Sequence, residues 1–329
     1  MTSYYSPITY IIPPEEDDWL LKTILHKRMD VSRKLLSRLK QTEQGITLNG
    51  ERVYISVHVK AGDIVQIRME TETSDDILPQ QIPFEILFED EHLLVVNKAA
   101  GIIVHPTHGH YTDTLANGVV HYWAQKNERF RFRPVHRLDQ ETSGVLVIAK
   151  NPYSHQHISE QMIAGTVDKR YAAFVHGSPV EPFGDIDGPI DRDPEEPHRR
   201  IVTPDGYPSL TRYEVKTVYA QGSKVELKLE SGRTHQIRVH MTSIGCPLIG
   251  DSMYRHELYN LPELTLTQSE QLKSVAALDA SIPRQALHAV RLTFKHPVLL
   301  QEMIFEAPLP PDMAALEEIL EQGLKANLS

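Results

Sequence analysis

The feature of this sequence that most constrains its fold is a set of short apolar segments rich in residues that favour β-strands. The intervals between them are unequal and contain helical patterns, for example His155–Ala164. Strands that are irregularly spaced and mixed with helices are typical of the α+β class, so we expect a mixed, largely antiparallel central sheet. The five segments are Leu93–Asn97, Val145–Ala149, Tyr171–Val175, Val225–Leu229 and Val290–Phe294.

Residues 1–69 carry a second, smaller pattern. Apolar residues recur at helix spacing in Leu20–Leu25, and a second helix is predicted through Lys40, with Asp30 or Ser32 as its N-cap. Strands are predicted at 46–50 and 64–67. Together these elements predict a small α/β domain at the N-terminus.

The charge of this N-terminal part differs from that of the chain. Residues 20–68 hold ten Lys or Arg and four Asp or Glu, although the whole chain has a net charge of −10. A local basic surface can bind phosphates while acids lie elsewhere. We therefore predict an RNA-binding module, with Arg33, Lys34 and Arg38 as candidate contacts. The alternative is a solvated charged surface without a ligand.

The remaining segments give the expected boundaries. Residues 70–82 are acidic and polar and are predicted to be a linker, which leaves residues 83–329 as the larger domain. Residues 184–200, rich in proline, glycine and charge, are predicted to be an exposed loop. Asp312 is predicted to cap a final helix.

Composition excludes several classes of protein. Hydrophobic residues make up 40% of the 329 residues, which is ordinary for a globular protein. The single cysteine, Cys246, excludes an internal disulfide and a cysteine zinc cage, and favours a reducing cytoplasm. No window approaches about 18 uninterrupted apolar residues, so no membrane span is expected. Residues 1–14 lack the basic start of a signal peptide.

The segment that indicates chemistry is His136–Gly144, which the apolar strand Val145–Ala149 follows at once. Polar groups against a buried strand are costly unless they are paired, so the Asp139 carboxylate is a candidate nucleophile or base. The alternative is a structural turn in which Asp139, Thr142 and Ser143 satisfy backbone groups.

Two further clusters accompany this segment. In Leu229–Met241, Arg233 and Arg238 lie near a glycine at a strand end, and an arginine beside Asp139 would keep the carboxylate ionised. The alternative is that this cluster is a structural turn between strand and helix, in which an arginine forms a satisfied ion pair. Tyr171 opens a strand and could stack on a base, although most aromatic residues in strands belong to the core.

From Ile82 to Leu309 the chain resembles the RluA-type pseudouridine synthases, and its motifs occur in that family's order. Departures from the family pattern are Ala99 after Lys98 and Cys246 before Pro247, which put loop shape and target choice in question. The N-terminal module resembles the S-four RNA-binding domain. The matching motifs are Glu89–Lys98 with Gly101 and Val104–Pro106, His136–Asp139 with Thr142–Gly144, Lys169 with Tyr171, Gly232–Arg238, Gly250–Asp251 and Leu287–Ala289.

The resemblance implies an enzyme that isomerises uridine in RNA without cofactor or metal. It implies that Asp139, Tyr171 and Arg233 are catalytic, with Arg233 paired to Asp139 and Tyr171 stacked on the uracil. The RNA would be ribosomal by preference, with transfer RNA as the alternative, and the protein a monomer. The residues implied to bind substrate RNA are His136, Arg137, Leu138, Thr142, His235, Gln236, Ile237 and Arg238.

Other functions remain to be weighed against this one. His105, His108 and His110 lie close together and could suggest a metal hydrolase, but no carboxylate pattern completes a site there. A non-catalytic RNA-binding protein that kept the fold but lost the reaction is disfavoured, because Asp139, Tyr171 and Arg233 are all present. A glycosidase would need a second carboxylate as the partner acid.

Overall fold

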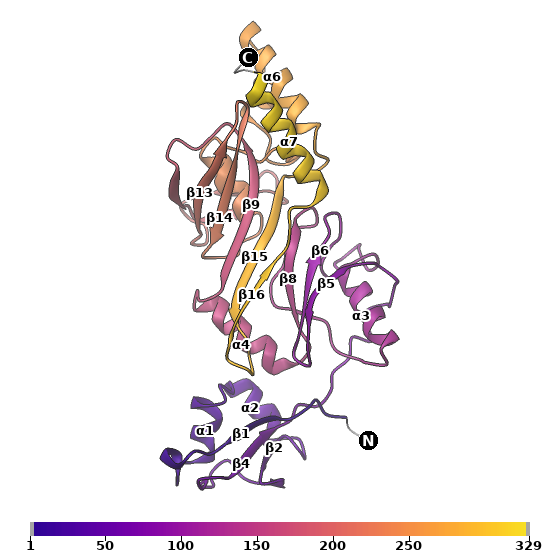
Figure 1. Cartoon of the computed structure of the whole chain (residues 1–329), viewed down its shortest axis with the longest axis vertical. Helices are drawn as coiled ribbons and strands as arrows, with labels where there is room; N and C mark the ends of the chain where they lie inside the picture. The colour runs from indigo at the N-terminus through magenta and orange to yellow at the C-terminus, as the bar shows by residue number, and fades with distance from the viewer. Residues whose placement is uncertain (1–2, 327–329) are drawn as a thin grey trace.

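The computed structural model describes residues 3–326, and its centre is a ten-stranded mixed sheet that contains all five predicted strands (Figure 1). Along the sheet the order is β10-β13-β14-β9-β15-β8-β6-β5, with β16 paired to β15 and β7 paired to β8. The fold class expected from the sequence is thus confirmed. The strands are β5 (Glu85–Glu89), β6 (Leu93–Lys98), β7 (Arg133–Pro134), β8 (Ser143–Ala149), β9 (Asp168–His176), β10 (Phe183–Asp187), β13 (Leu210–Val218), β14 (Gly222–Leu229), β15 (Leu287–Lys295) and β16 (Glu302–Glu306).

At the middle of the sheet, β15 and β8 run parallel, whereas the other paired strands of this sheet among residues 3–326 are antiparallel. Gly144 of β8 lies opposite Ala289 of β15 and has a φ of +117°. A Cβ at this position would lie 2.2 Å from the Ala289 carbonyl oxygen. The parallel pair therefore requires glycine where the polar turn enters the strand.

Helices cover both faces of this sheet, and residues of alternate parity in its strands belong to different cores. Leu94 and Tyr171 pack on the face that α3 and α5 cover, whereas Leu93 and Phe174 pack on the face of α4, α6 and α7. The helices are α3 (Leu115–Gln125), α4 (Pro152–Ile163), α5 (Gln236–Ser243), α6 (Leu266–Asp279) and α7 (Pro311–Ala326), with a short 3-10 turn, η2 (Glu257–Asn260).

The N-terminal module lies at one end of the molecule (Figure 1) and has its own sheet, in the order β1-β4-β2-β3. The expected helices and strands are present, and the Ser32 side chain accepts a hydrogen bond from the Leu35 N–H, so Ser32 and not Asp30 is the N-cap of α2. The sequence did not indicate β1. The elements are β1 (Ile8–Ile11), η1 (Pro14–Glu16), α1 (Leu21–Lys27), α2 (Arg33–Leu39), β2 (Ile46–Leu48), β3 (Glu51–Arg52) and β4 (Ile64–Ile67).

The segment expected to be a linker has no helix or strand, but it is tied to both parts of the chain. The carboxylate of Glu72 pairs with Arg38 of the module and with Arg131 and Arg133 of the larger domain. Burial alone would raise the pKa of Glu72, but the arginines lower it overall. Ile77, a few residues on, is buried in the main core. The linker therefore holds the two parts together.

Two local expectations were wrong. Residues 184–200 are not one loop, because they contain most of β10, all of β11 (Ile190–Arg192) and the first residue of β12 (Arg200–Val202), which pairs with β11. The final helix begins at Pro311, so Asp312 lies in its first turn and pairs there with Arg284. The helix expected over His155–Ala164 is present as α4, but it begins three residues earlier, at Pro152, because the Asn151 side chain caps it. In the part of the chain that the structure describes, no helix is long and apolar enough to cross a membrane.

Replacing Gly144 by alanine is expected to lower the free energy of unfolding by at least about 2 kcal/mol, because the new methyl group meets the Ala289 backbone and φ is positive. Urea unfolding at neutral pH measures this change. The matched control is Gly323→Ala in α7, where a Cβ meets no atom within 4 Å and alanine favours the helix. Equal stability of the two variants would contradict this account of the parallel pair.

Candidate active site

A cavity of about 560 Å³ opens on the sheet face that carries Tyr171. Its walls come from the turn that precedes β8, from β9 and from the loop that joins β14 to α5. The structure therefore brings together three sequence clusters that lie far apart in the chain. The predicted site residues that line this cavity are His136, Arg137, Leu138, Asp139, Thr142, Tyr171, Arg233, His235, Gln236, Ile237 and Arg238.

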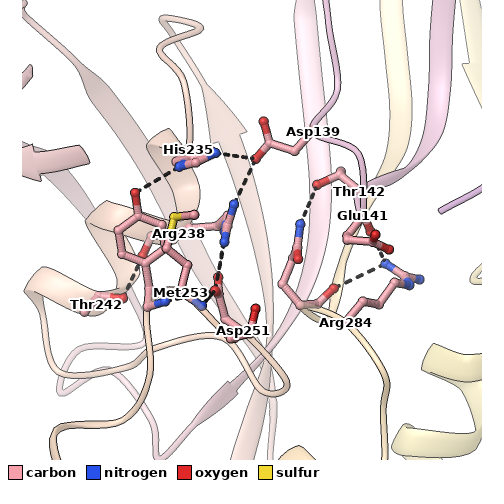
Figure 2. A network of polar contacts seen from close by, with 12 residues as sticks. Asp139, Glu141, Thr142, His235, Arg238, Thr242, Asp251, Met253 and Arg284 are labelled. Atoms are coloured by element: carbon pink, nitrogen blue, oxygen red, sulfur yellow. Dashed lines mark hydrogen bonds and ion pairs between the residues drawn. The ribbon is translucent and has the colours of Figure 1, made fainter. Parts of the chain in front are cut away.

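Asp139 lies at the start of a tight turn, in which the Thr142 N–H donates to the Asp139 carbonyl oxygen. Its side chain is 29% exposed and reaches into the cavity. Its Oδ2 atom lies 3.5 Å from Nη1 of Arg238 and 4.0 Å from Nε2 of His235 (Figure 2). The carboxylate therefore faces a cation and keeps an open side.

Arg238, the cation in contact with Asp139, is held from its other edge by Asp251. Its Nε and Nη2 atoms donate to the two carboxylate oxygens of Asp251 at 2.6 and 2.8 Å. The Asp251 side chain is fully buried, and the Tyr254 ring lies 4.9 Å from the guanidinium carbon. Burial alone would lower the pKa of Arg238, but Asp251 and Asp139 raise it overall. A two-bond pair of this kind fixes the guanidinium plane.

The pairing expected between Arg233 and Asp139 is wrong. Within residues 3–326, the arginine that contacts Asp139 is Arg238, whereas the exposed guanidinium of Arg233 lies 5.2 Å from the centre of the Tyr207 ring. The physical reason is the helix start between them. Arg233 belongs to the loop before α5, while Arg238 lies in its first turn and points into the protein.

His235 has a left-handed backbone with a φ of +58°, which places its ring between Asp139 and Tyr254. The Tyr254 hydroxyl accepts the Arg200 N–H and lies 2.9 Å from Nδ1 of His235. The Tyr254 hydroxyl therefore donates its proton to Nδ1 of His235. Since a neutral imidazole carries one N–H, that proton is on Nε2, which faces Asp139. Burial lowers the pKa of His235 although Asp139 opposes this shift, so the ring is neutral at pH 7.

Tyr171 lines the cavity from the middle of the sheet. It lies opposite Leu227 of the neighbouring strand β14 and is 6% exposed. Burial raises the pKa of its hydroxyl, and the Asp139 carboxylate adds to this effect. Tyr171 therefore presents a neutral phenol at the cavity wall.

The turn that carries Asp139 accepts a hydrogen bond from a buried lysine, Lys98. The Nζ atom of Lys98 donates to the carbonyl oxygens of Ala99, Ile102 and Gln140 at 2.8 to 2.9 Å. Burial lowers the pKa of this ammonium to about 7, but three acceptors match the three donors of the charged form. Because Gln140 follows Asp139 directly, Lys98 fixes the position of the carboxylate.

Residues that precede β15 hold the other end of the turn. Arg284 donates to the Glu141 carbonyl oxygen at 2.9 Å and forms an ion pair with Asp312 (Figure 2 shows Arg284 beside Glu141). The amide of Gln285 reaches the Thr142 hydroxyl at 3.4 Å. The turn is thus held at the three residues that follow Asp139.

Several residues predicted to contact RNA make their contacts within the protein. The side chain of Gln236 bonds to Ser231 and Thr211, and Ile237 belongs to the main core. His136 accepts the Val147 N–H, and burial lowers its pKa to about 3. These side chains shape the cavity wall. Leu138 and Thr142 are buried in the same way, whereas Arg137 is exposed at the cavity.

The predicted contacts in the N-terminal module lie outside the cavity. Arg33 and Lys34 are exposed on the first turn of α2. Arg38 is exposed as well, but Glu72 neutralises part of its charge. The sequence placed Asp251 and Lys98 in matching motifs but did not indicate that Asp251 pairs with Arg238 or that Lys98 anchors the turn, and it gave no sign of Tyr254. A buried acid can be inferred only after its cationic partner has been placed.

Comparison with known proteins identifies the fold and its class of reaction. Residues 92–243, which include Asp139, Tyr171 and Arg238, match the model of the RNA pseudouridylate synthase family. The chain is 37% identical to the uncharacterized RNA pseudouridine synthase YjbO of Bacillus subtilis, over 88% of this chain and 95% of the relative. The chain belongs to the RluA-type RNA pseudouridine synthases. As a synthase of this family, it is an isomerase that acts on RNA.

Two other proteins, one known by sequence and one by a solved structure, are also similar to this chain. It is 39% identical to the ribosomal large subunit pseudouridine synthase D of Nitrosomonas europaea, over 79% of this chain and 72% of the relative. The solved structure of human RNA pseudouridylate synthase domain containing 4 aligns with a TM-score of 0.56 at 27% identity, over 72% of this chain and 93% of that one.

Among residues 3–326, no group of three or more His, Cys, Asp or Glu side chains could hold a metal ion.

Arg238→Met is expected to lower kcat for uridine isomerisation by at least about a hundredfold, since a preorganised charge partner is typically worth that much. Tritium release from RNA labelled at uracil C5 measures turnover. Arg255→Met is the matched control, because Arg255 is exposed and stacks on Tyr259 outside the cavity.

Circular dichroism separates lost chemistry from lost folding, and Arg238→Lys, which keeps the charge, is the milder variant. If Arg233→Met abolished turnover while Arg238→Met retained it, the pairing seen in the structure would have no role in catalysis.

Proposed function

We propose that Asp139 starts the isomerisation of a uridine that has left its RNA stack and entered the cavity. The observation that carries the proposal is the position of its carboxylate, which is partly exposed, faces Arg238 and shares the cavity with Tyr171. The cavity lies within the range of about 300–1,000 Å³ that is usual for small-molecule sites. Flipping a base costs a few kcal/mol, and that cost is smallest in loops.

The reaction needs only groups that this chain supplies. The bond from uracil N1 to the ribose breaks, the base turns, and a bond from C5 forms in its place. An ionised carboxylate serves each of three routes, namely attack on the ribose anomeric carbon, attack on C6 of the base, and removal of the proton at the ribose 2′ carbon. Arg238 and the Nε2–H of His235 orient Asp139 for this step.

Two more side chains have roles in this proposal. Tyr171 stacks on the uracil and is placed for proton transfer at C5, and base–aromatic stacking is worth about 1–3 kcal/mol per base. The exposed Arg137, next to Leu138 on the catalytic turn, fills the gap that the uridine leaves. A planar guanidinium suits this task because it stacks on bases and reaches phosphate.

The RNA that we propose as substrate is large-subunit ribosomal RNA. The support is the similarity to relatives named ribosomal large subunit pseudouridine synthase D and the basic N-terminal module. With its buried free Cys246, the protein suits the reducing cytoplasm. Transfer RNA is the alternative substrate.

Purified protein is expected to release tritium from a large-subunit ribosomal RNA transcript labelled at uracil C5, and Asp139→Asn is expected to abolish release because the amide is a poor nucleophile and base. A transfer RNA transcript run in parallel tests the alternative. The control is Gln140→Asn, which keeps an exposed amide side chain at the position next to Asp139 and is expected to retain turnover. Normal turnover by Asp139→Asn would refute the proposed role of Asp139.

The N-terminal module is proposed to bind RNA phosphates through the exposed start of α2. Lys34→Glu is expected to weaken RNA binding and to flatten the plot of log affinity against log salt by at least about 0.7, the value of one lost phosphate contact. Fluorescence anisotropy measures both quantities. Lys273→Glu makes the same charge change on α6 and is expected to leave the slope unchanged. Equal slopes for the two variants would contradict the proposal that the module binds RNA.

A further inference from the structure

The cavity carries more positive charge than the reaction at Asp139 uses. Of the cationic side chains that line it, Arg238 is neutralised by Asp251 and Asp139. Among the residues that the structure describes, Arg137, Lys169 and Arg233 form no ion pair within 4.0 Å. These three charges therefore face the cavity and its mouth without an acid to balance them.

The remaining acid at the cavity does not balance them. The carboxylate of Glu230 lies 3.2 Å from Arg212 and 3.4 Å from Lys228, both on neighbouring strand positions. Glu230 favours the charged form of Lys169 from a distance, but it forms no ion pair with Lys169 within 4.0 Å, and its Oε1 atom contacts the other two cations. A positive field therefore remains at the loop between β14 and α5.

Lys169 is the most constrained of the three cations. It precedes Tyr171 by two residues in β9, so both side chains leave the same face of the sheet. It is half-buried, and its Nζ atom makes a single long hydrogen bond of 3.4 Å to the Ser231 carbonyl oxygen. Two of its three donors are left for a ligand. Burial lowers the pKa of Lys169, so holding the charge here costs stability unless an anion binds.

The loop opposite Lys169 leaves room for such an anion. A Cβ at Gly232 would lie 3.9 Å from Nζ of Lys169 and meet no other atom within 4 Å, so the absence of a side chain keeps the ammonium accessible. Arg233, the next residue, is exposed on the same loop and rests on the Tyr207 ring. The two cations thus flank the open position at Gly232.

We propose that Lys169 and Arg233 form a phosphate subsite, which holds an RNA phosphate beside the uridine that enters the cavity. The ligand is a phosphodiester and not a uracil carbonyl, because a carbonyl oxygen can accept a hydrogen bond but supplies no counter-charge, whereas a phosphodiester carries the negative charge that these two cations lack. Lysine serves as a point charge for phosphate, and arginine adds a planar fork. The subsite rests on the proposed function, since the phosphate belongs to the flipped nucleotide.

The first test uses protection of Lys169 from acetylation, read for each lysine by peptide mass spectrometry. Pentauridylate is the probe, and it is expected to slow acetylation of Lys169 at least threefold while leaving Lys273 on α6 unchanged. Failure to protect Lys169 would overturn the subsite. This assay needs no turnover, so its result is independent of whether Asp139 is the catalytic group.

The second test asks whether charge makes the contact. Lys169→Met is expected to flatten the salt dependence of pentauridylate affinity by about 0.7, so that the advantage of the wild type shrinks about 2.5-fold between 50 and 200 mM salt. Lys169→Arg is expected to restore the slope. Weaker binding with an unchanged slope would mean a structural role and would also overturn the proposal.

Arg233→Met keeps the test decisive if Lys169→Met fails to fold, because Arg233 is exposed and its loss leaves the core intact. It is expected to flatten the slope by the same amount and to raise KM more than it lowers kcat. A wild-type slope in this variant would remove Arg233 from the subsite.

Discussion

The active site depends on one buried guanidinium shared by two carboxylates. Taking Arg238 and Asp251 out of water costs several kcal/mol for each ion, and only close, paired hydrogen bonds offset that cost. The Asp251 carboxylate accepts two hydrogen bonds from the Arg238 guanidinium, at 2.6 and 2.8 Å. The remaining edge of the guanidinium faces Asp139. The position of the Asp139 carboxylate, the proposed reactive group, is therefore set by the ion pair between Arg238 and Asp251.

The sheet brings these groups into register. Asp139 enters from the turn before β8, while Arg238 comes from the helix after β14, and the two meet across the strands β9 and β15. The close parallel pair at Gly144 sets where the turn ends, and Lys98 donates to the Gln140 carbonyl oxygen in the turn as well as to those of Ala99 and Ile102. The Asp139 side chain, proposed to react, thus projects from a turn whose backbone is held by several hydrogen bonds.

Much of this arrangement could be predicted from the sequence, because strand patterns and the polar turn before Val145 are local features. The choice between Arg233 and Arg238 could not. It depends on where α5 starts and on the left-handed backbone of His235, which turns the chain between the two arginines.

Other features escaped prediction for similar physical reasons. The hairpin of β11 and β12 was not predicted, because each strand has only three residues and Pro194 and Pro197 lie between them. Asp251 lies 13 positions from Arg238, and their pairing depends on how α5 packs. The anchoring role of Lys98 depends on a loop 42 positions away. Composition and periodicity carry no information on contacts of this kind.

The ion pairs of Glu72 fix the distance between the N-terminal module and the cavity of the larger domain. With Arg38 on one side and Arg133 on the other, Glu72 prevents the module from swinging freely about its connection. The basic start of α2 and the cavity then stand a fixed span apart. On the proposal that the module binds RNA, an RNA held at both points would present its reactive nucleotide at that span, and the enzyme would select among chemically identical uridines by their distance from the bound phosphates.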